Sequence, residues 1–512
     1  MPYLAHRFGK GKKFAFDYAM RHCAFIDIYQ IYKYETSRVG KGIAGGFSLD
    51  NVAMHELGHG KWKRKGKVTD LTSDELKEYN MTDVRVLKEL DEKFSFSDTK
   101  IKLAQLTNLC LCSWRSNKKR YELKPLIMVD NLILQEARKN KLVLPNRDYT
   151  EKDEGIVGAL VLEPKVGIYD GVQNFDVKQM YPNIMIYERI SPDKDRILVP
   201  NILKQLKLLR EELKARYNKT KLKEDYLTQY AVKVLANVFY GAFGNPACRI
   251  YDRDLAQRIT AKGRKILSEI KQLCETAGFT VLYGDTDSIF TQVSKDKVPV
   301  LQQIINDRIN PYEIESGEYY DKLLFVGDVS GGAKKRYAGL TDTGEIKTVG
   351  MESVRRDYCI LARECQLFAI HKMLGGSTKE ELQQCLRTLQ NAMKRKEYDD
   401  WLVITKGVKP LNEYNLKTKK GNISRGLPHI RALKMAKELG HQESFDISFV
   451  YTKKDVEPVF DRTDLQKIDI DYDLYFDRQI MAVIRPIFSA LHLDELAEKD
   501  IMQTTLFEHM SS

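Results

Sequence analysis

The spacing of hydrophobic positions separates predicted helices from predicted strands along this chain. Apolar residues recur every three or four positions in four long segments, which is the pattern of amphipathic helices. These segments are residues 70–94, 202–217, 226–243 and 255–277. Apolar and polar residues alternate, as in antiparallel strands, in residues 156–186, 279–282 and 289–293. A strand-rich stretch follows at 334–349 and lysine-rich helices follow from about residue 358, so we expect a mixed α/β (α+β) fold.

Two of the predicted strands flank residues 283–288, Tyr-Gly-Asp-Thr-Asp-Ser, and place two carboxylates at the tip of a β-hairpin. Asp285 and Asp287 are two positions apart, so on a regular strand their side chains would leave the same face. Two hard oxygen ligands suit Mg²⁺, which takes further ligands from water and substrate phosphates. The same residues also make an ordinary polar turn, and the segment alone leaves both interpretations open.

The composition favours a large basic protein with a polyanionic partner. The 512 residues suffice for three or four domains, and Lys plus Arg exceed Asp plus Glu by 83 to 71, a net charge of +12. A lysine-rich surface gives the same balance without such a partner. Of the eight cysteines only Cys110 and Cys112 are close, without zinc-site spacing, so we expect reduced thiols. No membrane span or signal peptide is visible, so we expect a cytoplasmic protein without membrane contact.

Two further segments carry side chains suited to phosphate chemistry. Asp176 follows a strand-like run and opens residues 176–183, Asp-Val-Lys-Gln-Met-Tyr-Pro-Asn, which adds a third carboxylate. Two predicted helices carry amine, guanidinium, amide and phenol groups at helical spacing. These are Arg210 and Lys214 on the first helix and Lys233, Asn237 and Tyr240 on the second. They have the donors to bind a triphosphate, although each residue alone also fits a solvated basic face.

The order of these segments resembles the three polymerase motifs of family B DNA polymerases. The motifs are Asp-x-x-x-Met-Tyr-Pro, then Lys-x-x-x-Asn-x-x-Tyr-Gly, then Tyr-Gly-Asp-Thr-Asp-Ser. The resemblance continues in Lys-Lys-Arg-Tyr-Ala-Gly at 334–339, in Gly-Met-Glu-Ser-Val-Arg-Arg-Asp at 350–357, and in Pro428-His429 after Tyr414. It covers nearly the whole chain and is most similar to the archaeal and viral type.

The resemblance implies a right-hand polymerase with palm, fingers and thumb, preceded by a partial RNase H-like exonuclease domain. The implied division is a partial 3′–5′ exonuclease-like domain at 1–100, a helical connection at 101–150, palm at 151–199, fingers at 200–249, palm again at 250–340, and thumb with a C-terminal tail at 341–512. The implied partners are primer–template DNA and dNTPs. A basic loop at 417–425 would extend the DNA contact of the thumb, or is a solvated loop.

The resemblance also implies DNA-directed DNA synthesis by two-metal-ion nucleotidyl transfer. Asp176 and Asp287 would ligate two Mg²⁺ ions, for which Mn²⁺ can substitute, and Asp285 would shape the site. The remaining roles are triphosphate binding for Arg210, Lys214 and Lys233, base-pair contact for Asn237 and Tyr240, ribose exclusion for Tyr181, and primer–template contact for Lys334, Lys335, Arg336 and Tyr337. The alternative is a catalytically silent nucleic-acid-binding subunit of a split polymerase, and the retention of so many site residues argues against it.

The N-terminal region resembles only part of a proofreading exonuclease. Residues 79–83, Tyr-Asn-Met-Thr-Asp, resemble the third exonuclease motif, with Asp83 as metal ligand and Tyr79 beside the attacking water. An ordinary acid near a helix start fits the same pattern. Residues 2–4, Pro-Tyr-Leu, resemble the tripeptide directly after the second motif, so the other carboxylates are expected upstream of Met1. We therefore expect no proofreading by this chain alone, which is either truncated or completed by a second polypeptide.

Two weaker patterns give further hypotheses. Residues 55–59, His-Glu-Leu-Gly-His, satisfy the HExxH pattern of zinc metalloproteases, but Gly58 and Gly60 weaken the helix that this site needs. Residues 503–507, Gln-Thr-Thr-Leu-Phe, faintly resemble a sliding-clamp-binding peptide, and a frayed tail is the alternative.

Overall fold

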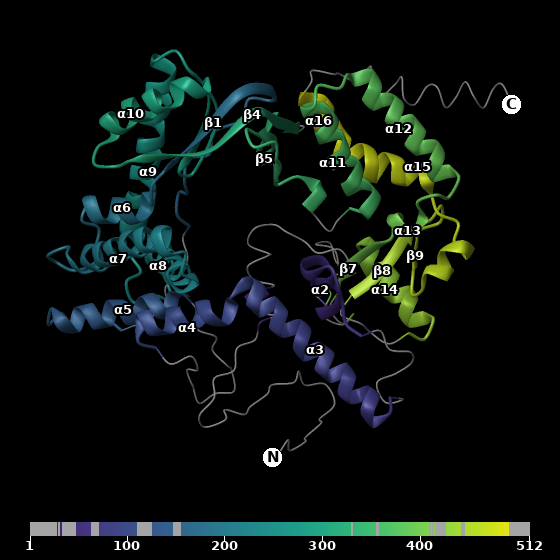
Figure 1. The fold of residues 1–512 in the computed structure, drawn as a ribbon, viewed down its shortest axis with the longest axis horizontal. Helices are drawn as coiled ribbons and strands as arrows, with labels where there is room; N and C mark the ends of the chain where they lie inside the picture. Colours follow the sequence, from purple (N-terminus) through teal and green to yellow (C-terminus); the bar gives the residue numbers. More distant parts are fainter. Residues whose placement is uncertain are drawn as a thin grey trace, which may run out of the picture. The chain divides into compact units, whose positions relative to one another are not determined.

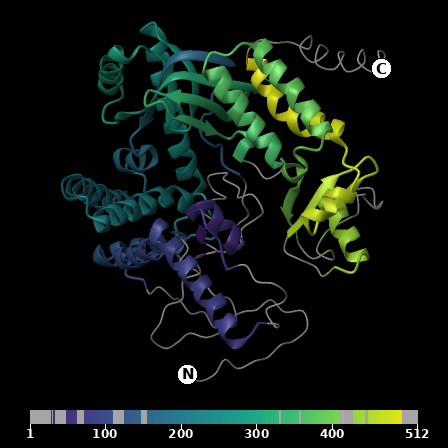
Figure 2. The ribbon, with the colours of Figure 1, turned by 45° about the vertical axis from the view of Figure 1, so that its right-hand side comes forward.

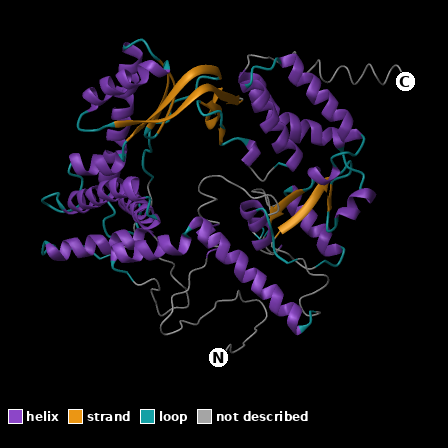
Figure 3. Cartoon of the chain, viewed as in Figure 1, coloured by secondary structure: helices purple, strands orange, loops and turns teal. Residues whose placement is uncertain are grey.

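The computed structural model describes residues 48–62, 71–109, 125–146, 155–328, 331–354, 358–408, 426–441 and 446–490, with single residues at 28, 31, 32, 411 and 414. The pair Cys110 and Cys112, the basic loop 417–425 and the tail segment 503–507 lie outside this part. So do Met1 to Leu4 and residues 355–357. The chain forms two compact units, drawn in Figure 3 by secondary structure. The smaller comprises Met1–Ile28, Ser95–Glu154 and Arg189–Arg253, and the larger comprises Tyr29–Phe94, Gly155–Glu188 and Asp254–Ser512.

The larger unit is built on a six-stranded antiparallel sheet with the order β2-β3-β1-β4-β5-β6 (Figure 1). Its strands are β1 Gly167–Val177, β2 Thr280–Asp285, β3 Ser288–Gln292, β4 Ile314–Asp328, β5 Gly331–Thr341 and β6 Ile346–Val349. Strand β1 lies between β3 and β4, so segments distant in the sequence become neighbours. Buried aromatic rings pack against one another on this sheet. The centroid of the Phe290 ring lies 5.7 Å from that of Tyr283 and 5.9 Å from that of Phe325.

Three helices flank this sheet. They are α6 Met180–Tyr187, α9 Arg253–Thr276 and α10 Val298–Ile309. Helix α10 packs on β4. Helix α9 approaches α6 closely because Gly263 has no side chain: a Cβ there would lie 3.0 Å from Met180 and 3.3 Å from Tyr181. The predicted helix at 255–277 is confirmed, whereas the strand prediction for 156–186 holds only for 167–177.

The C-terminal part of the larger unit combines helices with a second sheet, β7-β8-β9 (Figure 2). The strands are Ile404–Gly407, Asp446–Tyr451 and Val456–Pro458. The helices are α11 Ile360–Leu374, α12 Lys379–Lys394, α13 Asp399–Leu402, α14 Pro428–Glu438, α15 Tyr472–Tyr475 and α16 Ala482–Ala490. Helix α14 covers β8 and β9, and α16 packs on α11 and β4. The purely helical prediction for this third is wrong, because strands of three to six residues are too short for periodicity to reveal.

The N-terminal part of the larger unit contributes α2, Leu49–Leu57, packed against α3, Ser73–Phe94. Helix α3 starts where the sequence predicts, since Thr72 Oγ1 accepts the Glu75 N–H at 3.3 Å and the Glu75 carboxylate accepts the Thr72 N–H at 2.8 Å. Such a reciprocal pair satisfies donors that a helix start leaves open.

The smaller unit is helical in its described part. Its helices are α4 Phe96–Thr107, α5 Pro125–Lys139, α7 Leu198–Thr220 and α8 Lys223–Phe243. Helices α7 and α8 form a hairpin, and α4 and α5 both pack on α8. The apolar stripe predicted on α8 is buried, with Leu235, Phe239 and Phe243 inaccessible to solvent. An ion pair between Arg216 and Asp225 joins α7 and α8 beside the turn that connects them.

Two expectations from composition can be compared with the described residues. None of the described helices has both the length and the apolar character needed to cross a membrane. The described cysteines are free thiols: Cys248, Cys274, Cys359, Cys365 and Cys385. Burial raises the pKa of Cys274 to about 11, so this thiol stays protonated at neutral pH.

Candidate active site

The hairpin predicted around residues 283–288 is present, with a tighter tip than a regular strand allows. Strand β2 ends at Asp285, which pairs with Ser288 at the start of β3. Thr286 has a left-handed backbone, with φ of 62°, and its N–H donates to the Leu160 carbonyl at 2.9 Å. Because Thr286 turns the chain between them, Asp285 and Asp287 do not lie on one regular strand, and the prediction of a shared strand face is wrong.

Strand β1 brings the third predicted carboxylate to the same place. Asp176 pairs with Ser288 across β1 and β3, and Asp285 pairs with the same Ser288 across β2 and β3. The Val177 N–H donates to the Asp287 carbonyl at 2.8 Å, which locks the end of β1 to the hairpin tip. Asp176, Asp285 and Asp287 therefore gather at one end of three neighbouring strands. Across the sheet, the backbones at Asp176 and Asp285 are separated by two strand spacings, roughly 10 Å.

The donor set at this end of the sheet fits Mg²⁺ bound together with a substrate. Among the described residues, no three His, Cys, Asp or Glu side chains lie close enough together to hold a metal ion by themselves. Mg²⁺ sites that act on nucleotides use one or two carboxylates and complete the shell with water and substrate phosphates. Asp176 and Asp285 lie two strands apart, with Asp287 at the hairpin tip, so one or two of these carboxylates could serve as ligands in such a site.

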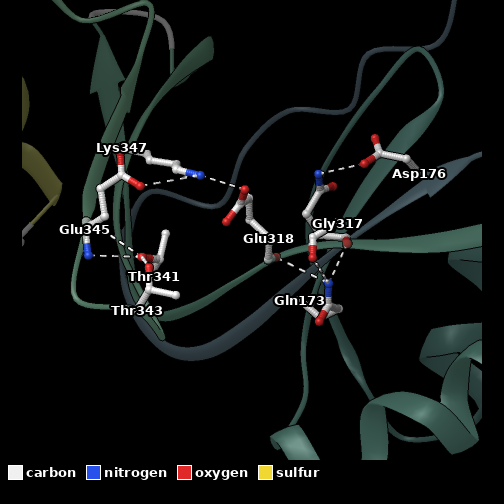
Figure 4. A network of polar contacts seen from close by, with 9 residues as sticks. Gln173, Asp176, Gly317, Glu318, Thr341, Thr343, Glu345 and Lys347 are labelled. Atoms are coloured by element: carbon white, nitrogen blue, oxygen red, sulfur yellow. Dashed lines mark hydrogen bonds and ion pairs between the residues drawn. The ribbon is translucent and has the colours of Figure 1, made fainter. Parts of the chain in front are cut away.

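Each of two carboxylates has a specific protein partner. Asp285 Oδ2 lies 2.9 Å from Lys335 Nζ, and Asp285 Oδ1 accepts the Thr286 hydroxyl at 3.0 Å. Asp176 Oδ2 accepts a hydrogen bond of 3.1 Å from the Asn174 side-chain amide, as Figure 4 shows. Sequence reasoning missed Asn174, although its position two residues before Asp176 on one strand was the available signal.

The segment predicted to contact primer–template DNA, Lys334 to Tyr337, lies on β5. Lys334 and Lys335 are exposed. Lys335 is bound to the hairpin, since its own N–H also donates to the Tyr283 hydroxyl at 3.0 Å. Burial raises the pKa of Tyr283 to about 12, so the phenol is neutral and can accept this bond.

The next two side chains of this segment point into the protein. Arg336 pairs with the buried Glu352, and the Tyr337 ring packs 5.2 Å from Phe290 between centroids. Burial raises the pKa of Tyr337, as expected for a phenol in an aromatic cluster. These contacts support the strand that presents Lys334 and Lys335.

Tyr181 lies in the first turn of α6, directly after the strand that carries Asp176. Gln179 between them has a left-handed backbone, with φ of 43°, which turns the chain from β1 into the helix. Tyr181 is half-buried and packs next to Gly263 of α9, so its ring is held between two helices.

The predicted triphosphate-binding residues belong to the smaller unit. On α8, Lys233 and Asn237 are exposed and Tyr240 is half-buried, in keeping with their shared helical face. On α7, Lys214 is exposed, but Arg210 is buried with 9% of its surface accessible. The alternative of a solvated basic face is therefore wrong for Arg210, because this residue lies on the packed side of the helix, and its predicted role in triphosphate binding stays a prediction.

The two residues of the exonuclease-like motif are brought together with a lysine. Lys61 Nζ lies 2.8 Å from Asp83 Oδ2 and donates to the Tyr79 hydroxyl at 3.0 Å. Although burial lowers the pKa of Lys61, the hydrogen bonds to Asp83 and Tyr79 raise it above its ordinary value. The Lys61 ammonium thus occupies the side of Asp83 that faces Tyr79.

The two histidines of the HExxH pattern do not share a helical turn. Helix α2 ends at Leu57, and Gly58 follows with a left-handed φ of 77°. His59 Nε2 pairs with Glu89 at 2.8 Å, and Glu56 accepts from Tyr32 at 2.6 Å and from Lys93 at 2.9 Å. A zinc protease site needs both imidazoles on one helix, so this geometry contradicts that hypothesis.

Comparison with known proteins identifies the fold. The family described as DNA polymerase family B matches residues 121–195 and 190–491. The chain is 31% identical over 431 residues to a DNA polymerase of Archaeoglobus fulgidus, which covers 74% of this chain and 53% of that protein. It is 26% identical over 505 residues to DNA polymerase II of Escherichia coli, covering 86% of this chain and 60% of that protein.

A solved structure agrees with these relatives. The family B DNA polymerase of the hyperthermophilic archaeon Pyrobaculum calidifontis superposes with a TM-score of 0.62 at 27% identity, covering 89% of this chain and 62% of that one. The chain spans about half the length of the curated relatives it matches. The mixed α+β architecture is that of a right-hand polymerase, and the chain belongs to the family B DNA polymerases.

Proposed function

We propose that this chain is a DNA-directed DNA polymerase that extends a primer 3′ end with dNTPs on a template. The observation that carries the proposal is the pairing of both Asp176 and Asp285 with Ser288, which gathers three aspartates at the hairpin tip. Asp176 and Asp287 would hold Mg²⁺ or Mn²⁺, which would supply charge neutralisation for in-line displacement.

The protein's own side chains would prepare the reactants around this centre. Asp285, balanced by Lys335, would shape the hairpin without adding an uncompensated charge. Exposed Lys334 would contact the primer–template backbone, where contacts position the duplex without reading its sequence. Tyr181, held next to Gly263, would set the floor of the sugar pocket and exclude a ribose 2′-hydroxyl.

Donors on α7 and α8 would bind the incoming nucleotide. Lys214 and Lys233 are exposed, and their positive charges would neutralise charge that grows on the triphosphate in the transition state. Asn237 and Tyr240 would line the base-pair pocket. Arg210 is buried on the packed side of α7, so its guanidinium would bind the triphosphate from there rather than from an exposed face.

We also propose that this chain does not proofread by itself. The exonuclease-like motif contributes Asp83, and that carboxylate is paired with Lys61. Two-metal hydrolysis needs carboxylates that are free to bind metal, and the ammonium group of Lys61 opposes metal binding at Asp83.

The test is extension of a labelled primer–template with dNTPs and Mg²⁺ by the intact chain and by Asp287→Ala. Because Asp287 would hold the metal, we expect its loss to slow extension by about 100-fold or more. Asp296→Ala removes an exposed carboxylate of the same unit as the control and should extend normally. Unchanged extension by Asp287→Ala would overturn the proposed mechanism. Tight DNA binding without extension by the intact chain would favour the silent subunit instead.

A further inference from the structure

The strand that carries Asp176 contains an irregularity directly beside this carboxylate. Strands β1 and β4 pair Val172 with Tyr320 and Gln173 with Tyr319, but Phe175 pairs with Ser316. Gly317 and Glu318 of β4 therefore both lie opposite Asn174, which is the arrangement of a β-bulge. Bulges redirect side chains, and this one lies two residues from a proposed metal ligand.

A buried amide holds the bulge in place. The Gln173 side chain, 3% exposed, directs Nε2 toward three backbone carbonyls, those of Asn174 at 2.7 Å, Gly317 at 3.2 Å and Glu318 at 3.3 Å (Figure 4). Because the bulge interrupts the hydrogen bonds between β1 and β4, these carbonyls would lack a donor without the Gln173 amide. The side-chain carboxylate of Glu318, also at the bulge, pairs with Lys347 of β6 at 2.6 Å.

The bulge brings the backbone of β4 against the Asp176 carboxylate. A Cβ at Gly317 would lie 2.9 Å from Asp176 Oδ2 and 3.2 Å from Asn174 Nδ2. Both distances are shorter than ordinary van der Waals contact, so a side chain at this position would displace the carboxylate or the amide. Glycine leaves the space in which the Asn174 amide donates to Asp176 Oδ2 at 3.1 Å.

We propose that Asn174 and Gly317 are positioning residues that fix the orientation of the Asp176 carboxylate for metal binding. Asn174 would hold one oxygen through its amide N–H, and Gly317 would keep the adjacent space open. Groups that hydrogen-bond a metal-ligating carboxylate set its orientation, and their loss costs about 10-fold to 100-fold in metal affinity or activity. This inference rests on the proposed role of Asp176 as a metal ligand.

The test measures metal binding directly, separately from catalysis. Mn²⁺ is titrated by electron paramagnetic resonance into the chain bound to primer–template and a non-hydrolysable dNTP analogue. Asn174→Leu keeps the approximate volume and removes the donor. We expect this substitution to weaken Mn²⁺ binding about 10-fold or more and to raise the Mg²⁺ concentration for half-maximal extension. Affinity for primer–template in EDTA should not change.

Gly317→Ala provides a second, independent perturbation that keeps every polar side chain. The added methyl group should displace Asp176 Oδ2, so Mn²⁺ binding should weaken as in Asn174→Leu. Gly158→Ala is the matched control, because its Cβ would meet nothing within 4 Å. Gln292→Leu is the control for the amide, since Gln292 Nε2 donates to the Asp170 carbonyl at 3.1 Å, on the same sheet. Both controls should bind Mn²⁺ like the intact chain.

The outcomes separate the two proposals. If Asn174→Leu and Gly317→Ala bind Mn²⁺ and extend primers normally while Asp176→Ala loses both properties, the positioning inference is overturned and the polymerase proposal stands. If Asp176→Ala itself binds Mn²⁺ and extends normally, the proposed function fails. Should Asn174→Leu unfold at the assay temperature, the result of Gly317→Ala decides.

Discussion

The ammonium group of Lys335 lies 2.9 Å from the Asp285 carboxylate, although β5 and β2 are not neighbours in the sheet. The Lys335 backbone is left-handed, with φ of 61°, and its N–H donates to Tyr283 of β2 at 3.0 Å. The Lys335 carbonyl lies close to Gly350, where any Cβ would collide with it, so glycine at position 350 permits this close approach. Lys335 therefore joins the predicted DNA-contacting segment to the predicted catalytic hairpin.

This contact predicts different effects for two adjacent lysines. Lys335→Ala should lower the single-turnover extension rate about 10-fold, because Asp285 loses its partner beside the reacting groups. The stability cost should stay within about 1 kcal/mol, since the Lys335 side chain is 61% exposed. Lys334→Ala should instead weaken DNA binding and reduce its salt dependence by about one counterion. Rapid-quench extension and fluorescence anisotropy at several salt concentrations measure both; identical behaviour of the two variants would contradict the assignment.

The buried side-chain amide of Gln366 on α11 should contribute strongly to stability. Gln366, fully buried on α11, donates to Glu352 at 2.7 Å and to the Val483 carbonyl at 3.0 Å, and accepts the Ser353 N–H at 2.6 Å. Gln366→Leu would remove the hydrogen-bond partner of the Val483 carbonyl, of the Ser353 N–H and of one Glu352 oxygen, whereas Arg336 would still pair with Glu352; it should lower the free energy of unfolding by about 3 kcal/mol. Urea denaturation measures this change. Gln384→Leu, at an exposed position of α12, should stay within about 0.5 kcal/mol, and equal effects of both substitutions would refute the prediction.

The start of α7 should show a pH-dependent contribution from Asp193. Its carboxylate accepts the N–H groups of Ile197 at 2.9 Å and Leu198 at 3.1 Å, and the Ser191 hydroxyl. Burial raises the pKa of Asp193, but these bonds outweigh it and hold the pKa below 3.8. The stabilisation is therefore fully present above pH 3.8 and is lost as the pH falls through the lower folded-state value.

Asp193→Ala should consequently destabilise the chain by about 1 kcal/mol at pH 7. Thermal unfolding of both chains from pH 7 downward should show the difference shrinking once the pH falls below the ordinary value of 3.8. Asp193→Asn keeps a capping oxygen and should lie between them at pH 7. A difference that grows on acidification would show that the ionised carboxylate does not stabilise α7.

The ion pair at the exonuclease-like motif predicts that a mismatched primer is not shortened by this chain. Lys61 pairs with Asp83, and this positive charge opposes the binding of metal ions to the carboxylate. Incubation with a labelled mismatched primer and Mg²⁺, without dNTPs, should leave the primer intact for both the native chain and Asp83→Ala. Rapid digestion that disappears in Asp83→Ala would defeat the prediction.

Several elements could be predicted because their information is local. Helices α3, α8 and α9 are long, so the helical period is repeated several times within each. The hairpin at 283–288 could be recognised because a short polar turn separates two apolar runs. Residues 156–166, by contrast, alternate like a strand but do not form a regular one: beside β2 they make an isolated bridge from Val161 to Asp285 and separate backbone hydrogen bonds, such as that from the Leu162 N–H to the Gly284 carbonyl at 2.8 Å.

The sequence alone indicated the family of this protein, because the carboxylates, basic groups and phenols stand in the order and spacing of the family B DNA polymerase motifs. Tertiary structure decided which of these groups meet. Asp176 and Asp285 share Ser288 because of strand register, and register between distant segments depends on long-range packing rather than on local pattern. For the same reason only the folded chain places Lys335 on Asp285, buries Arg210, and sets Asn174 and Gly317 beside Asp176.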